Sequence, residues 1–444
     1  MKRKNTLYYL LVLFVCFWIF SVPTFASGLE WKGYFQTETR FSLQNNSELT
    51  WQETNLRLQP EVNTNNARFY GEFSLRAPGV AFQLPKESSV SNQVLLELDE
   101  AYLDLYATPW QQIDLRIGKQ LIPWGTGYLL NPTNNLNPED LRDLFTFGRY
   151  LGSNALKATS YLGEVTLTGI YIPTFAPAAL PESPRFQSLF HSELPALPFE
   201  TNEYITEIPP AKLLKESSSW GLRLEKSILD CDFSVSYIDG RYTLPVPKIT
   251  LSPDQAAPGK VDLLCELIYP RRKIVGFDLA GAYGGLSFWG EVAIFFPEEV
   301  KTVSDLSALG AGKIEITTLE DTPYTKYLIG FDYSINDLYF NSQYLHGFPQ
   351  ERGTKELSNY LVSCLEFTLH DGKIKIPFNT CLEVKDFSKF SDTYAFILSP
   401  EICYYPEINT EIIISLRLID GKPETTLGKM KDLDEIGLKV KYSF

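Results

Sequence analysis

The sequence predicts an all-β fold: a transmembrane, antiparallel, up-and-down β-barrel of about 18 strands, with about 16 as the other count that the pattern allows. Three observations predict it. The carboxyl-terminal residues alternate between apolar and polar side chains, long and short connections alternate along the chain, and one face of many expected strands carries charges that a dry core could not bury.

The last nine residues give the clearest strand signal. The apolar members of this segment are Ile436, Leu438, Val440, Tyr442 and Phe444, and small or charged residues stand between them. A period of two gives one apolar and one polar strand face. This aromatic ending in mid-strand resembles the terminal signature by which bacterial outer-membrane barrels are recognised for assembly, which implies that Tyr442 and Phe444 act as a signal to the barrel-assembly machinery. An ordinary amphipathic edge strand is the alternative.

The amino terminus indicates export. A basic start at residues 2–4 precedes an apolar run over residues 7–20, and small residues follow near Ala26. The run is shorter than the ~20 residues that a membrane helix needs. We therefore expect residues 1–26 to be a cleaved signal peptide. Residues 27–444 are then the mature barrel, which reaches the outer membrane of a Gram-negative cell after export to the periplasm.

The composition suits a barrel and excludes some partners. Aromatic residues make up 14% of the chain, and membrane barrels need such residues for their interfacial girdles. The formal net charge of −14 argues against nucleic acid as a partner. The sequence contains no phosphate-binding glycine loop and no cluster of metal ligands, so we expect no cofactor and no metal.

Turn signals divide the chain into segments of about the length that crosses a bilayer as a tilted strand. The expected strands cover residues 29–41, 51–62, 67–77, 95–107, 110–120, 154–162, 164–172, 217–226, 229–239, 271–283, 285–296, 323–334, 337–347, 357–369, 373–385, 392–404, 409–419 and 433–444. Short turns follow the even strands, and long outer loops are expected near residues 121–153, 173–216, 240–270 and 297–322. An even number of strands places both termini on the periplasmic side.

Three expected hairpins agree in register. The turns at Asn336-Asp337, Gly284-Gly285 and Asp371-Gly372 each place the apolar faces of their two flanking strands on the same side of the sheet. A large soluble β-sandwich would also alternate, but it would not sort its loop lengths by parity.

The polar strand faces define an expected lumen. Its pore-lining candidates are Glu38, Arg40, Arg57, Arg68, Glu72, Arg76, Glu100, Asp104, Asp114, Arg116 and Glu291. About 16–18 strands leave an aqueous channel that can hold such charges. Both signs occur, so no clean selectivity filter is expected, although the arginines of the first five strands hint at a basic ladder for anions.

The expected loop at 121–153 contains two Asn-Pro turns and a Trp-Gly pair, so it should be ordered. If it folds inward it narrows the pore, and its constriction candidates are then Trp124, Asn131, Asn137, Asp140 and Arg142. The alternative is an external cap on the rim. The proline-rich loop at 173–216 should be extended, either as a lid or as a passive shield.

Several stretches carry a family resemblance. Residues 100–104 (EAYLD), 116–120 (RIGKQ), 124–125 (WG) and 137–140 (NPED) look like those of a group of large, mostly uncharacterised Gram-negative outer-membrane barrels, which is related to porins and to the alginate-export channel. The resemblance covers nearly the whole mature chain. It implies an outer-membrane channel and carries no catalytic residues.

The expected function is therefore a porin-like channel for passive diffusion of small hydrophilic solutes or ions. The alternatives are a dedicated export channel for an anionic polysaccharide and a structural or adhesive surface barrel with a plugged lumen. An enzyme is not expected, because His191, His346 and His370 lack convincing catalytic partners in the sequence. Outer-membrane lipid and lipopolysaccharide are the expected surroundings, and a homotrimer is left open.

Overall fold

The protein is represented by a computed structural model that describes residues 28–44, 48–78, 94–107, 112–181, 200–210, 213–254 and 260–444. The expected signal peptide, residues 1–26, lies outside the described residues, so its cleavage stays a prediction.

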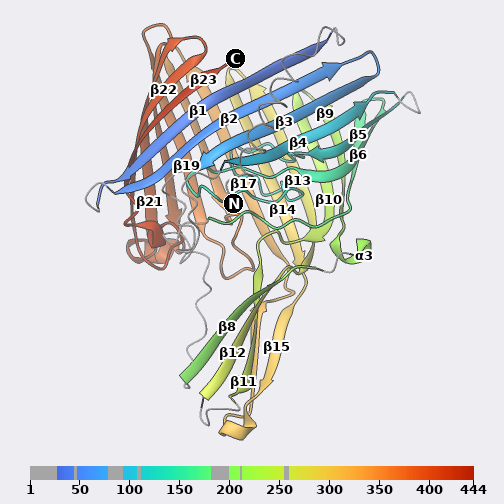
Figure 1. The fold of residues 1–444 in the computed structure, drawn as a ribbon, viewed down its shortest axis with the longest axis vertical. Helices are drawn as coiled ribbons and strands as arrows, with labels where there is room; N and C mark the ends of the chain where they lie inside the picture. Colours follow the sequence, from blue (N-terminus) through green and yellow to red (C-terminus); the bar gives the residue numbers. More distant parts are fainter. Residues whose placement is uncertain are drawn as a thin grey trace, which may run out of the picture.

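The main body is one antiparallel sheet of 18 strands that closes on itself (Figure 1). Its strands are β1 (Leu29–Ser42), β2 (Leu49–Asn63), β3 (Ala67–Pro78), β4 (Leu95–Leu105), β5 (Ile113–Gln120), β6 (Ser153–Leu162), β7 (Val165–Ile172), β9 (Ser219–Ile228), β10 (Cys231–Arg241), β13 (Arg271–Tyr283), β14 (Leu286–Pro297), β17 (Tyr324–Ile335), β18 (Leu338–His346), β19 (Asn359–Leu369), β20 (Ile374–Val384), β21 (Tyr394–Glu407), β22 (Thr410–Gly421) and β23 (Glu435–Ser443). The predicted barrel and its count of 18 strands are confirmed.

Closure depends on the pairing of the first strand with the last. β1 runs antiparallel to β23 from Tyr34 opposite Ser443 to Ser42 opposite Glu435. Gly33 and Phe444 extend this ladder by exchanging two backbone hydrogen bonds of 3.0 Å. A Cβ atom on Gly33 would lie 2.2 Å from the carbonyl oxygen of Arg57 and 3.0 Å from the Phe444 ring, so only glycine fits at this seam.

The three hairpins have the predicted register. Tyr333 pairs with Phe340 across the turn between β17 and β18, and Phe277 pairs with Val292 across the turn between β13 and β14. The third hairpin, β19–β20, aligns Phe367 with Ile376 in the same way. Pairing of apolar residues across each strand pair keeps one face of the sheet apolar.

Loop lengths also separate by parity. Short turns at residues 64–66, 163–164, 229–230, 284–285 and 336–337 join strands at the end of the barrel where the chain terminates; we call it the turn end. The long connections lie at the opposite end, the loop end, where a β-structured extension projects from the barrel (Figure 1).

The extension was not predicted, because it forms inside segments expected to be loops. A three-stranded sheet contains β8 (Glu200–Ile208), β12 (Lys260–Ile268) and β11 (Val246–Pro253), with β8 parallel to β12. A hairpin of β15 (Val300–Asp305) and β16 (Lys313–Leu319) packs on it around a small apolar core that includes Val261, Leu263 and Leu306.

Helices are few and short among the described residues. They are α3 (Leu214–Ser217) and the 3₁₀ turns η1 (Ser307–Leu309), η2 (Phe387–Asp392) and η3 (Gly428–Met430). In this part of the chain no helix combines the length and the apolar character that a membrane crossing requires.

The outer face of the barrel is apolar. Large side chains that point outward and stay exposed include Phe35, Leu75, Leu103, Ile117, Leu156, Leu222, Val235, Phe277, Ile329, Phe331, Leu361, Phe378, Ile402, Ile414 and Leu438. A continuous apolar belt around a closed sheet with no free edge is the arrangement that a bilayer core accepts. The barrel surface is therefore that of a membrane-spanning protein.

On this surface, we expect the free-energy cost of introducing a charged side chain to depend on how deep in the bilayer it lies. Ile329, at the centre of β17, is 65% exposed, and Ile335 lies on the same face beside a short turn. Ile329→Arg should lower the free energy of unfolding by about 2–4 kcal/mol, and Ile335→Arg by at most about 1 kcal/mol. Urea unfolding in lipid vesicles, followed by tryptophan fluorescence, measures both. Equal costs would show that this face does not cross the bilayer core.

Candidate functional site

The inner face of the barrel has a charged wall and a mainly apolar wall, and the second also holds buried charges such as Arg223, Asp278 and Glu383. The charged wall belongs to β1–β5, where the buried polar side chains include Arg40, Glu72, Arg76 and Asp104. The two large apolar clusters inside the barrel draw on β6 to β22, and within the described residues neither includes a side chain from β1–β5. The candidate site lies between these two walls and is formed by the segment that joins β5 to β6.

On the charged wall the arginines of β2, β3 and β5 face carboxylates of neighbouring strands, whereas Arg40 of β1 pairs with Glu38 of its own strand and with Asp143 of the connection after β5. The closest ion pairs are Arg57–Glu72 at 2.8 Å, Arg68–Glu61 at 3.0 Å, Arg76–Glu53 at 2.7 Å and Arg116–Asp104 at 2.6 Å. These pairs run across the strands, so each strand neutralises charge on the next. The arginine ladder suggested by the sequence is thus interleaved with acids.

A long segment lies inside the bore between the walls. We call residues 121–152, which join β5 to β6, the inner loop. It folds inward, which is one of the two arrangements expected for this loop. Its apolar residues Ile122, Trp124 and Leu136 pack into the cluster on the apolar wall. Trp124 is only 5% exposed and lies against Gly221, where an added Cβ atom would be 2.7 Å from the indole ring.

One carboxylate holds the first half of the inner loop. Glu291, in β14, is 1% exposed and accepts hydrogen bonds from the backbone N–H groups of Thr126 and Gly127, both at 2.6 Å, and of Thr133 at 3.1 Å. The Asn131 amide at 2.9 Å and the Thr133 hydroxyl at 2.8 Å complete the set. Five donors around one buried carboxylate replace the water that it loses.

Two amide side chains fix the loop further. Gln343, in β18, accepts from the backbone N–H of Tyr128 at 3.0 Å and donates to its carbonyl at 2.6 Å. Asn137 accepts from the N–H of Ile122 at 2.6 Å and donates to the carbonyls of Gln120 and Leu151, which ties the two ends of the loop together. The loop is therefore fixed where its two ends meet, by Asn137, and at Tyr128, by Gln343.

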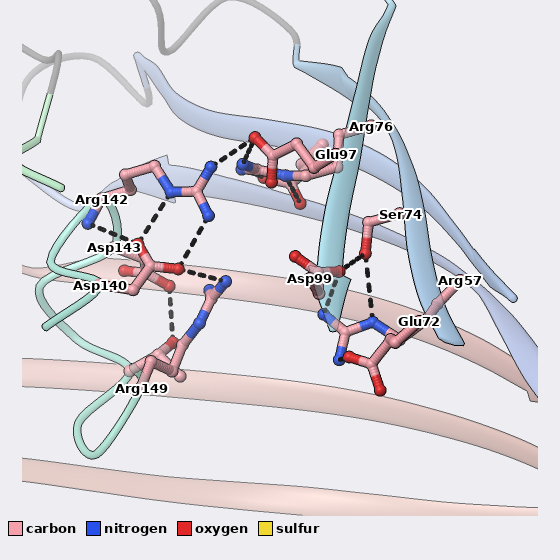
Figure 2. Close-up of polar contacts among 12 residues, drawn as sticks. Arg57, Glu72, Ser74, Arg76, Glu97, Asp99, Asp140, Arg142, Asp143 and Arg149 are labelled. Carbon is pink, nitrogen blue, oxygen red and sulfur yellow. Dashed lines mark hydrogen bonds and ion pairs between the residues drawn. The ribbon is translucent and has the colours of Figure 1, made fainter. Parts of the chain in front are cut away.

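The second half of the loop reaches the charged wall. Arg142 binds Glu97 of β4 at 2.6 Å and Asp140 at 2.8 Å, and Arg149 binds Asp140 at 2.9 Å (Figure 2). Figure 2 shows this group beside a second one on the wall, in which the Arg57 guanidinium lies between Glu72 and Asp99.

Asp143 forms a bidentate contact with Arg40 of β1, with hydrogen bonds of 3.0 and 2.6 Å. Burial opposes ionisation of Asp143, but the adjacent Arg40 guanidinium outweighs it and holds the pKa of this carboxyl well below its usual range. The pKa of Asp140 is also lowered, because its arginine partners outweigh its burial. Both loop carboxylates are therefore charged at neutral pH.

A cavity of about 460 Å³ remains between the inner loop and the charged wall. Its lining carries charges of both signs: Arg57, Arg76, Lys119, Arg142 and Arg149 with Glu72, Glu97, Asp99 and Asp140. We call this space the polar cavity. The side chain of Asn55 also lines it, is 8% exposed, and has a buried carbonyl oxygen with no hydrogen-bond partner.

The predicted site residues fall into groups. Arg57, Glu72, Arg76, Asn131, Asn137, Asp140 and Arg142 line the polar cavity, and Glu38, Arg40, Arg68, Asp104 and Arg116 make ion pairs inside the barrel. Glu100 accepts from the backbone N–H of Leu121, while Asp114 accepts from that of Ala107 and from the Tyr161 hydroxyl. Glu291, expected to line the pore, and Trp124, expected at a constriction, are instead buried between loop and wall. Tyr442 and Phe444 end the closing strand, and their role in assembly stays a prediction.

Sequence reasoning missed Glu97 and Asp99. Alternation from Glu100 and Asp104 placed even positions of this strand inward, which puts residues 97 and 99 on the lipid side. The structure has a register shift between Glu72 and Phe73, so that Glu72 faces Glu100 but Ser74 faces Glu97. A β-bulge of this kind inverts the alternation beyond it and turns both acids inward.

His, Cys, Asp and Glu side chains do not gather in threes that could hold a metal ion anywhere in the described part of the chain. The arrangement inside the barrel is one of paired charges around a space, with an ordered loop across it.

One protein-family model, described as a protein of unknown function (DUF1302), matches residues 34–375. The chain belongs to the DUF1302 family. No curated protein matches it in sequence. The family match agrees with the expected uncharacterised barrel group, and the link of this DUF1302 chain to alginate export stays a hypothesis.

Solved structures share the fold of the DUF1302 chain. The Pseudomonas aeruginosa outer-membrane protein opdK is 8% identical with a TM-score of 0.52, and P. aeruginosa OccK8 (OprE) is 10% identical with a TM-score of 0.51; each alignment covers 95% of this chain and 99% of the other. Acinetobacter baumannii OccAB4 is 9% identical over the same shares, with a TM-score of 0.51. At these identities the likeness concerns the barrel fold.

The Glu291 contacts predict a loop that one substitution releases. Glu291→Ala removes the acceptor of five hydrogen bonds, so the backbone amides of Thr126, Gly127 and Thr133 should exchange with solvent at least about tenfold faster. Hydrogen–deuterium exchange with mass spectrometry measures this. Glu61→Ala is the matched control, because Glu61 pairs with Arg68 away from the loop. Unchanged protection in Glu291→Ala would show that the apolar contacts alone hold the loop.

Proposed function

We propose that this protein is an outer-membrane channel for passive diffusion of small hydrophilic solutes or ions, with its termini on the periplasmic side. The observation that carries the proposal is the polar cavity, in which the charged wall of β2–β4 faces space and not packed protein. Charged side chains at such density are stable inside a membrane barrel only beside water or beside one another. Lipid and lipopolysaccharide would surround the apolar belt.

The charge pattern favours a channel without strong ion preference. Arginines and carboxylates alternate along the lining, so their fields largely cancel within a Debye length. An anionic polymer would need an uninterrupted basic track, and here each arginine of the wall already has an acidic partner. This pairing supports small solutes over polysaccharide export.

A surface barrel with a plugged lumen is the second candidate. The observation in its favour is the inner loop itself, which contacts β1 through Asp143, β4 through Arg142, β14 through Glu291 and β18 through Gln343. These contacts span the bore. Whether the bore conducts distinguishes the two candidates.

The decisive measurement is single-channel conductance of the refolded mature protein in a planar lipid bilayer. We expect steady, ohmic conductance that grows with salt concentration, and a reversal potential close to zero in a salt gradient because the lining is balanced in charge. Silence from protein whose gel migration shows heat-modifiable folding would contradict the diffusion-channel proposal and favour the plugged barrel.

The ion pair of Asp143 predicts how conductance depends on pH. Ionised Asp143 stabilises the docked loop, and because its pKa is lowered there, this contribution is complete above the ordinary aspartate pKa of about 3.9 and is lost as the pH falls below it. Conductance should therefore stay constant from pH 8 to pH 5 and rise only below about pH 4.

Asp143→Asn should give the wider conductance already at neutral pH, since the amide cannot form the ion pair with Arg40. A step in conductance near pH 6 in the unmodified protein would contradict this assignment, because no group of the pair titrates there.

A further inference from the structure

A second cavity of about 170 Å³ lies on the loop-end side of the inner loop. The inner loop forms one side of it, and the connections after β10, β18 and β22 form the rest. Its apolar lining consists of Leu130, Leu141, Leu144, Phe147, Leu244, Phe348, Leu427 and Met430. We call it the apolar cavity. Leu130, Leu427 and Met430 are at most 5% exposed, so this side of the cavity is packed interior, while exposed residues such as Thr146 and Lys429 border its open side.

The lining is mainly apolar and its chemistry suits a ring, with polar side chains such as Thr146, Gln350 and Thr426 at its border. Phe147 and Phe348 both line the cavity and meet edge to face, with their ring centroids 5.7 Å apart. Packed interiors rarely keep a gap of this size, and an enclosed apolar void of about 150 Å³ accepts a molecule such as benzene, which sets the scale for what the apolar part of this cavity can hold. The apolar cavity has the volume of one six-membered ring with a small substituent.

The carboxylates at the edge of the apolar cavity are already satisfied. Asp143 is held by Arg40, Glu139 accepts from the Thr243 hydroxyl, and Asp140 binds two arginines. These carboxylates are therefore poorly placed to bind a charged ligand. A ligand in this cavity would be held mainly by contacts with the apolar side chains.

The apolar cavity adjoins the polar cavity. Asp140, Gly148, Arg149 and Tyr150 line both spaces. Arg149 is the most open of the loop arginines, with 36% of its side chain exposed, and its ion pair uses one end of the guanidinium. A molecule seated in the apolar cavity can thus direct a polar substituent past Gly148 towards the paired charges of the wall.

We propose that the apolar cavity is a binding site for small amphipathic molecules that carry one ring-sized apolar part and a polar substituent. This inference rests on the proposed function and narrows its solutes: the channel would take ring-bearing compounds through the apolar cavity and the polar cavity in turn, in preference to sugars of the same size, which would lose their hydration in the first cavity without gaining hydrogen bonds.

The test is direct binding of 4-fluorobenzyl alcohol to the folded full-length mature protein, followed by fluorine-19 relaxation in detergent. We expect saturable line broadening that cyclohexanol displaces and myo-inositol, a polyhydroxylated ring, does not. Leu144→Trp fills the cavity with an indole ring and should weaken binding by at least about tenfold.

Leu43→Trp is the matched control, because Leu43 is exposed and lies outside the cavity lining. It adds the same ring at the same micelle concentration, so partition of the probe into detergent cancels between the variants. Met430→Phe fills the cavity from the opposite wall and replaces Leu144→Trp if that variant fails to show heat-modifiable folding.

Equal broadening by the unmodified protein, Leu144→Trp and Met430→Phe would overturn the site, as would displacement by myo-inositol. The binding readout does not require conduction. A protein that conducts but does not bind the probe refutes this inference alone, whereas one that binds but never conducts refutes the channel and leaves the site as a pocket in a closed barrel.

Discussion

The pairing of β1 with β23 is the contact on which the rest of the structure depends. It joins the two ends of the chain's main sheet, from Tyr34 opposite Ser443 onward, so that every strand has two neighbours. A closed sheet satisfies its backbone groups without an edge, which is the condition for standing in lipid. Closure also separates an inner face of the sheet from an outer one. Alternate residues of each strand then face the lipid, where they form the apolar belt, or the interior, where they form the polar wall. The glycine at position 33, where a side chain would collide with Arg57 and Phe444, shows how tightly this seam is built.

Inside the barrel, the inner loop decides which part of the bore is protein core and which part is open. It adds its own apolar side chains to the inward residues of β6 to β22 and so converts half of the wall into packed interior. A buried carboxylate without a cationic partner would normally be unstable there. Glu291 is tolerated because backbone N–H groups, which the loop must satisfy in any case, supply its hydrogen bonds. The hydrogen bonds between Glu291 and the loop N–H groups thus offset the desolvation cost of burying both the carboxylate and the loop backbone.

Much of this could be predicted from alternation, because a barrel strand needs little beyond a period of two and a turn. All 18 barrel strands lie within a few residues of their predicted bounds. Two features could not be predicted from the sequence, for physical reasons. The extension joins β8 and β12, between which the chain passes through the barrel strands β9 and β10 and then β11. Such long-range pairing leaves no local signal beyond the alternation of Val261, Leu263 and Cys265. The bulge at β3–β4 inverted the faces of Glu97 and Asp99. The predicted lumen charges were largely placed inward, but which of them meet space depended on the loop, whose path follows from tertiary contacts alone.

The pairing of charges on the wall has a consequence for what the bore can recognise. An arginine with no partner would hold a counter-ion and bind any anion that entered. Arg57, set between Glu72 and Asp99, already has its charge neutralised, so a passing anion must compete with carboxylates that are fixed in place. Long-range electrostatic attraction between the wall and an anion is therefore weak. Discrimination between solutes has to arise from direct contacts, through the shape of the solute and the cost of removing its water. The two cavities differ in both respects: one offers hydrogen-bonding groups around about 460 Å³, and the other offers carbon surface around about 170 Å³. In the channel that we propose, this arrangement would select a solute by how polar and apolar groups are distributed along it, and hardly at all by its net charge.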